Sequence, residues 1–301
     1  MGKGAPMTQA LPISVATMAI RRYGDLPAFR SHIDTLAAEA ADKGSRVLLL
    51  PELTCVGLLW AYPEAAQTTV SDVADLYRRR LTPLFGPYQE SLRDVAQHRR
   101  IALAGGSFWH EESGKGVNSA FIAFPDGTMQ RQDKLHCTRP EQAIDTIGGE
   151  DLHAFEVDGV RIGLLICYDI QFPELTRHLV AEGIQLLLVP SLTSERGYWR
   201  VRHCAHARAV ENQIYVCVSP LIGDLGIPTD HPVQGCGSAF VACPIDNRFN
   251  IDDGTYARGP ANAESLLHVS LDLARLDLSQ HRSEIRQRAD RRPALYARLR
   301  T

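Results

Sequence analysis

The sequence lacks any long hydrophobic run, and it lacks the cysteine pairs of a disulfide or zinc-binding framework. No apolar stretch approaches the roughly 18 to 20 residues that span a bilayer, and the N-terminus has no apolar core of a secretory signal. The 7 cysteines are odd in number and include no C-x-x-C pair. We therefore expect no membrane partner, a cytoplasmic location and mostly reduced, buried thiols.

Net charge is also nearly absent. The 32 Lys and Arg residues are offset by 35 Asp and Glu, which leaves a net charge of −3. Such a balance provides no overall field for nucleic acid or an anionic membrane, so we expect a small-molecule partner and no nucleic-acid partner. With 45% hydrophobic and 22% charged residues, the composition is that of an ordinary globular protein.

No linker or repeat divides the chain of 301 residues, so the sequence predicts one large domain. Residues 1–10 are expected to form a flexible tail, and residues 11–275 the domain itself. Residues 276–301 are charged and rich in arginine, and we interpret them as a C-terminal tail that packs between subunits. A long loop is predicted over 222–237, where Gly, Pro and Asp are frequent.

Apolar runs typical of strands alternate with segments of helical period, which indicates an α/β fold. The predicted strands lie within 13–20, 46–52, 101–109, 118–125, 161–167, 185–191, 214–220, 238–243 and 265–271. The predicted helices are 27–43, 71–98, 173–182, 197–212 and a short one at 292–299. Gly44, Gly183 and Asn212 stand where C-terminal caps are expected. Pro125-Asp126-Gly127 predicts a hairpin, and therefore a partly antiparallel sheet.

Three reactive side chains stand where apolar runs end. Cys167 follows an apolar run and precedes Pro173, the predicted first residue of a helix. Ligand sites in α/β sheets gather at such strand ends. Glu52 ends the run VLLLPE, and Lys134 ends the second strand of the hairpin. A buried carboxylate or ammonium is costly unless it is paired, so these positions favour a shared pocket. Taken singly, each residue also fits an ordinary structural role, the cysteine as a small core side chain.

The segments VLLLPEL, DKLH and LLICYDIQFPEL resemble, in this order, the three signatures of the nitrilase or carbon–nitrogen hydrolase superfamily. The resemblance extends over roughly residues 12–271. It places the family's glutamate, lysine and cysteine at Glu52, Lys134 and Cys167. Glu141, in HCTRPEQ, matches a second glutamate of the family, and ARAVENQIYV resembles its helix-to-strand segment.

This resemblance implies a four-layer α-β-β-α sandwich with two mixed β-sheets, and a homodimer or larger homo-oligomer. It also implies a cofactor-free and metal-free hydrolase that cleaves a small amide or N-carbamoyl compound through a cysteine thioester. In that chemistry Cys167 attacks, Glu52 exchanges protons, and Lys134 with the backbone N–H of Tyr168 stabilises the oxyanion. Glu141 is expected to orient Lys134 or the substrate.

The substrate is left open. Many family amidases have an arginine where this chain has Gln171, so an acidic substrate group is less expected here. Specificity is assigned to polar and aromatic residues near the motifs, namely Trp60, Tyr168, Gln171, Thr193, Tyr198 and Trp199.

Several alternatives stay open at this point. A nitrilase would use the same thiol on a nitrile carbon, and a non-catalytic scaffold could keep the same fold. His136 could pair with Cys167 as in cysteine proteases, although the three motifs favour glutamate and lysine. His203 and His206 lie three residues apart, but without a second ligand pair we interpret them as helix-packing residues.

Overall fold

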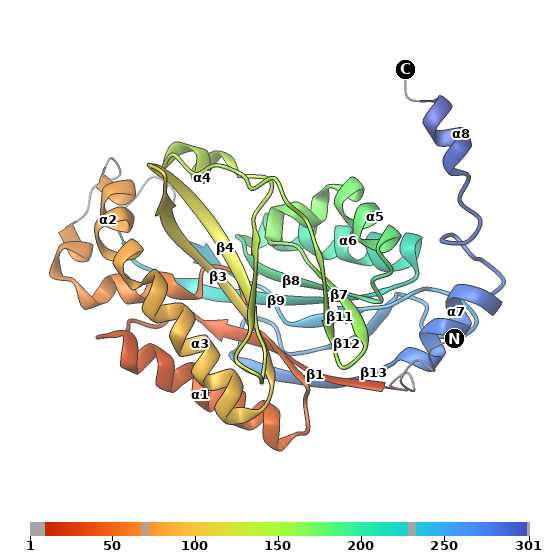
Figure 1. The fold of residues 1–301 in the computed structure, drawn as a ribbon, viewed down its shortest axis with the longest axis horizontal. Helices are drawn as coiled ribbons and strands as arrows, with labels where there is room; N and C mark the ends of the chain where they lie inside the picture. Colours follow the sequence, from red (N-terminus) through yellow and green to blue (C-terminus); the bar gives the residue numbers. More distant parts are fainter. Residues whose placement is uncertain (1–9, 68–71, 228–232, 300–301) are drawn as a thin grey trace.

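The computed structural model describes residues 10–67, 72–227 and 233–299 (Figure 1). Most of the predicted N-terminal tail, residues 1–9, lies outside the described residues, as do 68–71, 228–232 and 300–301. Among the described helices, none is long and apolar enough to cross a membrane.

The described strands join into one mixed sheet of 13 strands. Its main path runs β5-β4-β3-β2-β1-β9-β8-β7-β6, with β13 beside β1, β10 and β11 beside β9, and β12 beside β11. The strands are β1 (Ala10–Ala19), β2 (Val47–Leu49), β3 (Ala102–Glu112), β4 (Lys115–Ala123), β5 (Met129–Asp133), β6 (Ala154–Val157), β7 (Val160–Leu164), β8 (Leu186–Leu192), β9 (Tyr215–Asp224), β10 (Gln234–Gly235), β11 (Phe240–Ala242), β12 (Thr255–Arg258) and β13 (Ser265–Asp272).

The two halves of the sheet are joined by a short connection between β1 and β9. These strands pair only through Met18 with Leu221 and Ala19 with Ile222, so the sheet can bend there. Ile13 of β1 and Leu187 of β8 belong to one continuous buried core, although they come from opposite halves of the sheet path. The two halves therefore bend toward each other around this core. The result is a mixed α/β fold with a large sheet nearly closed on itself and helices around it (Figure 1).

Two groups of helices cover the sheet (Figure 1). Helices α1 (Leu26–Asp42) and α3 (Phe85–Arg99) lie side by side against the β2 and β3 half. Helices α5 (Pro173–Ala181) and α6 (Glu195–Asn212) contact each other, and α6 packs along β9. These α/β elements confirm the predicted strand and helix order, and the hairpin of β4 and β5 confirms the antiparallel part.

The prediction of one continuous helix over 71–98 is wrong. The described part divides into α2 (Val73–Arg80), the 3₁₀ helix η4 (Thr82–Leu84) and α3. Pro83 and Pro87 explain the division, because proline has no backbone N–H and disfavours a helical residue before it. The cap predicted at Asn212 is also displaced: the left-handed residue that ends α6 is Gln213, with φ 51°. Gly44 and Gly183 have the positive φ values that a C-terminal cap requires, 75° and 91°.

Three short strands were not predicted, namely β6, β10 and β12. Each has four residues or fewer and no strongly apolar run, so sequence alternation gives little signal. The loop predicted over 222–237 begins later, because β9 extends to Asp224, and it contains β10.

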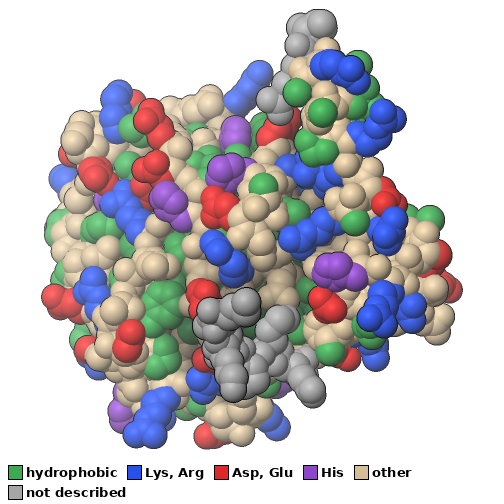
Figure 2. All heavy atoms as spheres, turned by 45° about the vertical axis from the view of Figure 1, so that its right-hand side comes forward, with side chains coloured by type: hydrophobic (Ala, Val, Ile, Leu, Met, Phe, Trp, Pro, Cys, Tyr) green, Lys and Arg blue, Asp and Glu red, His purple; other side chains and the backbone are tan. Residues whose placement is uncertain are grey.

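The C-terminal segment consists of α7 (Leu273–Arg282) and α8 (Pro293–Arg298). The Gln213 side chain anchors its first part by donating to the carbonyl oxygens of Ser279 at 2.7 Å and Ile285 at 3.3 Å. Helix α8 projects from the body (Figure 1), and Lys and Arg side chains gather on that face (Figure 2). Packing of 276–301 between subunits stays a prediction.

Candidate active site

Cys167 stands at a sharp backbone turn. Two residues after β7 comes the 3₁₀ helix η5 (Cys167–Gln171), whose first residue has φ 49°, a left-handed conformation that is unusual for a non-glycine residue. Such strained positions cluster at functional sites. The Cys167 Sγ lies 3.5 Å from the donating Ser191 Oγ and 3.7 Å from the Leu192 carbonyl oxygen. The thiol is therefore held against the C-terminal end of β8.

Glu52 approaches the same end of β8 from the other half of the sheet. The backbone N–H of Leu192 donates to Glu52 Oε2 at 2.9 Å, and Asn118 Nδ2 donates to Glu52 Oε1 at 3.1 Å. The carboxyl group and the Cys167 thiol meet at Leu192, because the N–H of this residue donates to Glu52 and its carbonyl oxygen lies 3.7 Å from the sulfur. Only 2% of Glu52 is exposed, so its polar atoms depend on these protein partners.

Lys134 lies between two carboxylates. Its Nζ is 2.7 Å from Glu52 Oε1 and 2.8 Å from Glu141 Oε1. The residue follows β5, and its backbone N–H donates to the Asn118 carbonyl oxygen at 2.8 Å, which continues the β4–β5 pairing. Hairpin pairing therefore fixes Lys134, and two carboxylates fix its ammonium group.

Glu141 is held by a capping box at the start of the short helix α4 (Arg139–Ala143). Its Oε2 accepts from both the backbone N–H and the hydroxyl of Thr138 at 2.8 Å, while its Oε1 faces Lys134 and Asn118. In a capping box the glutamate side chain bonds back to the N-cap residue, and Glu141 also contacts Lys134 through its other carboxylate oxygen. The structure thus brings together all four predicted catalytic residues, Glu52, Lys134, Glu141 and Cys167.

Burial and charge set the protonation states of this group. Burial lowers the pKa of Lys134, but the charges of Glu52 and Glu141 outweigh it and hold this pKa well above its usual value. Burial raises the pKa of Glu141, yet Lys134 and the hydrogen bonds bring it below the usual value. Burial also raises the pKa values of Glu52 and Cys167 overall, and the Glu52 charge raises that of Cys167 further.

These directions describe a neutral thiol beside a carboxylate that is more basic than usual, with a fixed ammonium group nearby. Such an arrangement can move a proton from sulfur to Glu52 while Lys134 stabilises negative charge. Tyr168 is the second residue of η5, and the first N–H groups of a helical turn have no partner within that turn. Its backbone N–H follows Cys167 directly in the chain, and its part as an oxyanion donor stays a prediction.

Sequence reasoning missed Asn118 and the backbone of Leu192. Asn118 Nδ2 donates to both Glu52 and Glu141, and its Oδ1 is buried with no hydrogen-bond partner among the described residues. The available signal was a polar residue at the head of the apolar run NSAFIAF. Leu192 gave no signal, because it acts through its main chain.

Asp169 connects the cysteine and lysine segments. It is 1% exposed and accepts from the backbone N–H of Leu135 at 3.1 Å and of His136 at 2.8 Å. His136 Nδ1 lies 3.1 Å from the same carboxylate, and its ring stacks on Phe172 at a centroid distance of 3.6 Å. The His136 ring is therefore bound to Asp169, and no hydrogen bond joins it to Cys167 in the described residues.

We expect Asp169→Asn to lower the free energy of unfolding by about 1–3 kcal/mol, because the amide group replaces an acceptor that faces backbone N–H donors. Denaturant unfolding at neutral pH measures this change. The control is Asp252→Asn at an exposed position, for which a change within about 0.5 kcal/mol is expected. Equal stability of the two variants would contradict a connecting role for Asp169.

The predicted specificity residues are distributed around this end of the sheet. Trp60 Nε1 donates to the Leu225 carbonyl oxygen at 2.8 Å, and Trp199 is 45% exposed on α6. Tyr198 is buried, and its hydroxyl lies 3.2 Å from Ser238 Oγ. Thr193 directly follows β8, and Gln171 ends η5. Along the chain, Tyr168 and Gln171 therefore lie near Cys167, and Thr193 follows Leu192, which contacts both Glu52 and Cys167.

The histidines of α6 have structural contacts. His206 Nδ1 lies 2.8 Å from the Arg202 carbonyl oxygen and its Nε2 lies 3.1 Å from Thr255 Oγ1, while His203 stacks on Trp199. No group of three or more His, Cys, Asp or Glu residues that could hold a metal ion occurs in the described part of the chain.

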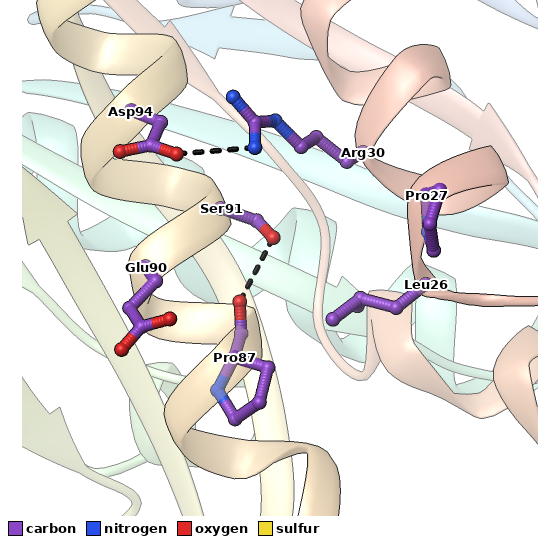
Figure 3. Close-up of a pocket in the computed structure, with 7 residues that line it drawn as sticks. All are labelled: Leu26, Pro27, Arg30, Pro87, Glu90, Ser91 and Asp94. Carbon is purple, nitrogen blue, oxygen red and sulfur yellow. Dashed lines mark hydrogen bonds and ion pairs between the residues drawn. The ribbon is translucent and has the colours of Figure 1, made fainter.

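A groove of about 270 Å³ lies elsewhere, between α1 and α3 (Figure 3). Arg30 and Asp94 face each other across it at 3.1 Å, and Ser91 donates to the carbonyl oxygen of Pro87 at 2.8 Å. Its side chains already satisfy one another, and none belongs to the catalytic group. We therefore assign no chemistry to this groove.

Comparison with known proteins finds relatives of this chain. A probable hydrolase of Bacillus subtilis is 31% identical over 291 residues, which are 95% of this chain and 55% of that protein. An omega-amidase of Xenopus tropicalis is 31% identical over 199 residues, 61% of this chain and 65% of that protein. This chain thus spans less than two thirds of the length of either relative.

The fold matches as well. A mutant of the Nesterenkonia AN1 amidase from the nitrilase superfamily superposes with a TM-score of 0.72 over 99% of this chain and 100% of the other, at 24% identity. The model of the family described as carbon–nitrogen hydrolase matches residues 13–277. This range includes the four predicted catalytic residues, Glu52, Lys134, Glu141 and Cys167. The chain therefore belongs to the carbon–nitrogen hydrolase family.

Proposed function

We propose that the protein hydrolyses the carbon–nitrogen bond of a small amide or N-carbamoyl compound through a thioester on Cys167. The observation that carries this proposal is the position of Lys134 between Glu52 and Glu141, with Glu52 and the Cys167 sulfur both in contact with the main chain of Leu192. A lone buried thiol of raised pKa would be a weak nucleophile, and it needs this base and this cation.

In the first half-reaction Glu52 takes the proton of Cys167 as the sulfur attacks the amide carbon. The oxygen of the tetrahedral intermediate becomes negative, and Lys134 with the Tyr168 N–H stabilises it. Glu52 then returns the proton to the departing nitrogen, which leaves as ammonia or an amine. The acyl group remains on sulfur as a thioester.

In the second half-reaction Glu52 takes a proton from water, and the resulting hydroxide attacks the thioester carbon. The carbon–sulfur bond breaks, and Cys167 recovers a proton from Glu52. Glu141 keeps Lys134 charged and oriented, since its Oε1 lies 2.8 Å from Nζ. One carboxylate with a raised pKa can perform each proton transfer, so the cycle needs no further base.

We expect Glu52→Gln to slow both half-reactions, since glutamine can neither take the thiol proton nor activate water. The acyl-enzyme that does form should be retained, because its hydrolysis has no base. Intact-mass measurement after incubation with an amide that carries isotope-labelled nitrogen should show the acyl group on the protein without the label. Fragment masses should locate it at Cys167.

Glu64→Gln is the control, because Glu64 pairs with Arg80 at a distance from the site. This variant should turn over the amide normally and accumulate no adduct. An adduct that forms from a nitrile and retains its nitrogen would instead identify a nitrilase. Absence of any adduct on Glu52→Gln, with unchanged turnover, would contradict the thioester route.

The relatives support an amide substrate, as the name omega-amidase indicates for the Xenopus protein. For this chain we propose the same class. Gln171 and Thr193 are the proposed specificity residues next to the catalytic group, and Trp60, Tyr198 and Trp199 are proposed to act farther out. A scaffold function is disfavoured because four costly buried polar residues are retained together.

Three broader expectations remain proposals. The helix pairs α1–α3 and α5–α6 on the two sheet halves support the four-layer arrangement. Light scattering would test the homodimer or larger homo-oligomer, and cell fractionation the cytoplasmic location.

A further inference from the structure

Two arginines that have no carboxylate partner in the described part of the chain meet where α6 packs against β11 and β12. Arg202 Nη1 donates to the Tyr198 hydroxyl at 3.4 Å, and Arg258 Nη2 approaches the same oxygen at 3.5 Å. Arg258 Nε also donates to Ser238 Oγ at 3.0 Å. We name these four residues, Tyr198, Arg202, Ser238 and Arg258, the arginine cluster.

The arginine cluster carries two guanidinium charges. Some arginines elsewhere pair with acids, as Arg99 does with Asp34 and Arg131 with Asp133. Among the described residues, neither Arg202 nor Arg258 forms such an ion pair. The backbone N–H of Thr255 donates to Asp253 at 2.9 Å and lowers the pKa of this carboxyl group, and the Arg202 charge lowers that pKa further. Two guanidinium groups at one oxygen repel each other, so an external anion would relieve the repulsion.

The arginine cluster also has unused hydrogen-bond donors. A guanidinium group carries five N–H donors, and these bonds use one from Arg202 and two from Arg258. Tyr198 and Ser238 are 7% and 0% exposed, whereas Arg202 is half-buried and Arg258 is exposed. The hydroxyl groups thus form a buried floor beneath guanidinium groups that solvent can reach.

Aromatic rings hold Arg202 in place. Its guanidinium carbon lies 5.8 Å from the Trp199 ring centre and 5.6 Å from that of Phe240. These distances are within the range of cation–π attraction. Arg202 is therefore ordered before any ligand binds, which reduces the entropy lost on binding.

The arginine cluster lies at the same edge of the sheet as Cys167. Ser191, whose hydroxyl donates to the Cys167 sulfur, pairs with Pro220 in the β8–β9 ladder. Strand β11 runs antiparallel to β9 with Phe240 opposite Val218, so Ser238 falls beside Pro220. Two strand spacings separate Ser191 from Ser238, a distance of about 10 Å.

We propose that Tyr198, Arg202, Ser238 and Arg258 form a binding site for a small oxyanion, a carboxylate or phosphate group. The planar guanidinium fork matches two oxygens of either group, and two forks with a hydroxyl floor surround it. The site uses none of the four proposed catalytic residues. The anion-binding proposal and the thioester proposal can therefore be tested separately.

Calorimetric titration with inorganic phosphate at constant ionic strength tests the site on the full chain. Wild type should bind phosphate, and Arg202→Gln and Arg258→Gln should each raise the Kd for phosphate at least tenfold. The control is Arg200→Gln, an exposed position on α6 outside the arginine cluster, which should bind like wild type. Circular dichroism melting without phosphate checks folding, and the exposed Arg258 position provides a variant with little structural risk.

Turnover of two matched linear amides, with and without a terminal carboxylate, identifies the source of the oxyanion. A raised KM for the acidic amide alone in Arg258→Gln would assign the site to the substrate's own acid group. Unchanged KM values, together with lost phosphate binding, would assign it to a separate anion. The proposal is overturned if wild type binds no phosphate, or if the arginine variants bind it equally. The proposal is likewise rejected if the arginine variants change oligomer size in size exclusion while they still bind phosphate. The arginine cluster would then be a subunit contact.

Discussion

Cys167→Ala should reduce amide turnover by a factor on the order of 10³ or more, because it removes the only thiol that the catalytic group contains. The loss should appear in kcat, since the acyl group has no atom on which to form. Ammonia release under saturating substrate measures it. The side chain is small and lies at the end of a core, so folding should be retained.

The control for this change is Cys204→Ala, which removes a half-buried thiol from α6. Its turnover should stay within about twofold of wild type, as expected for a surface substitution far from the chemistry. Similar ammonia release by Cys167→Ala and wild type would exclude Cys167 as the nucleophile, and with it the thioester.

Lys134→Met should produce the largest loss of stability. It leaves Glu52 and Glu141 buried near each other without the ammonium group that lies 2.7 and 2.8 Å from them. Breaking a buried pair in this way costs about 3–5 kcal/mol, because the remaining charge is uncompensated. Denaturant unfolding at pH 7 measures the difference, and amide turnover should disappear with it.

The stability difference should depend on pH in one direction. Lys134 lowers the pKa of both glutamates, so its removal raises their pKa values in the folded protein. Groups with a raised folded pKa bind protons more readily when folded, so they favour folding at low pH and lose that contribution as pH rises. The deficit of Lys134→Met relative to wild type should therefore shrink as pH falls from 7 toward 5.

Lys115→Met provides the matched control, because Lys115 pairs with Asp145 at 2.8 Å on an exposed part of β4. Exposed pairs contribute about 0–1 kcal/mol, so this variant should remain close to wild type at every pH. A deficit that is small, or that widens on acidification, would show that Lys134 does not neutralise the two glutamates.

The element order was predictable because the strands are apolar throughout and the helices alternate with them. Pro83 and Pro87 were visible signals of the break in 71–98, and helical periodicity on both sides concealed them. The short strands β6, β10 and β12 were not predictable, since tertiary pairing rather than local pattern forms them.

The four proposed catalytic residues could be named from side-chain chemistry at strand ends, together with three motifs of a known family. The connections among them were not. Leu192 acts through its peptide group, and Asn118 gains its role only when the β4–β5 hairpin brings Lys134 beside it. The arginine cluster combines residues from α6, β12 and the segment before β11, which no sequence spacing relates.

A single residue, Leu192, holds Glu52 through its N–H and faces the Cys167 sulfur through its carbonyl oxygen. Because both contacts come from the main chain, substitution of the leucine side chain cannot remove either one. Evolution can therefore vary the side chains that follow β8, and with them the choice of substrate, without separating the proton acceptor from the sulfur.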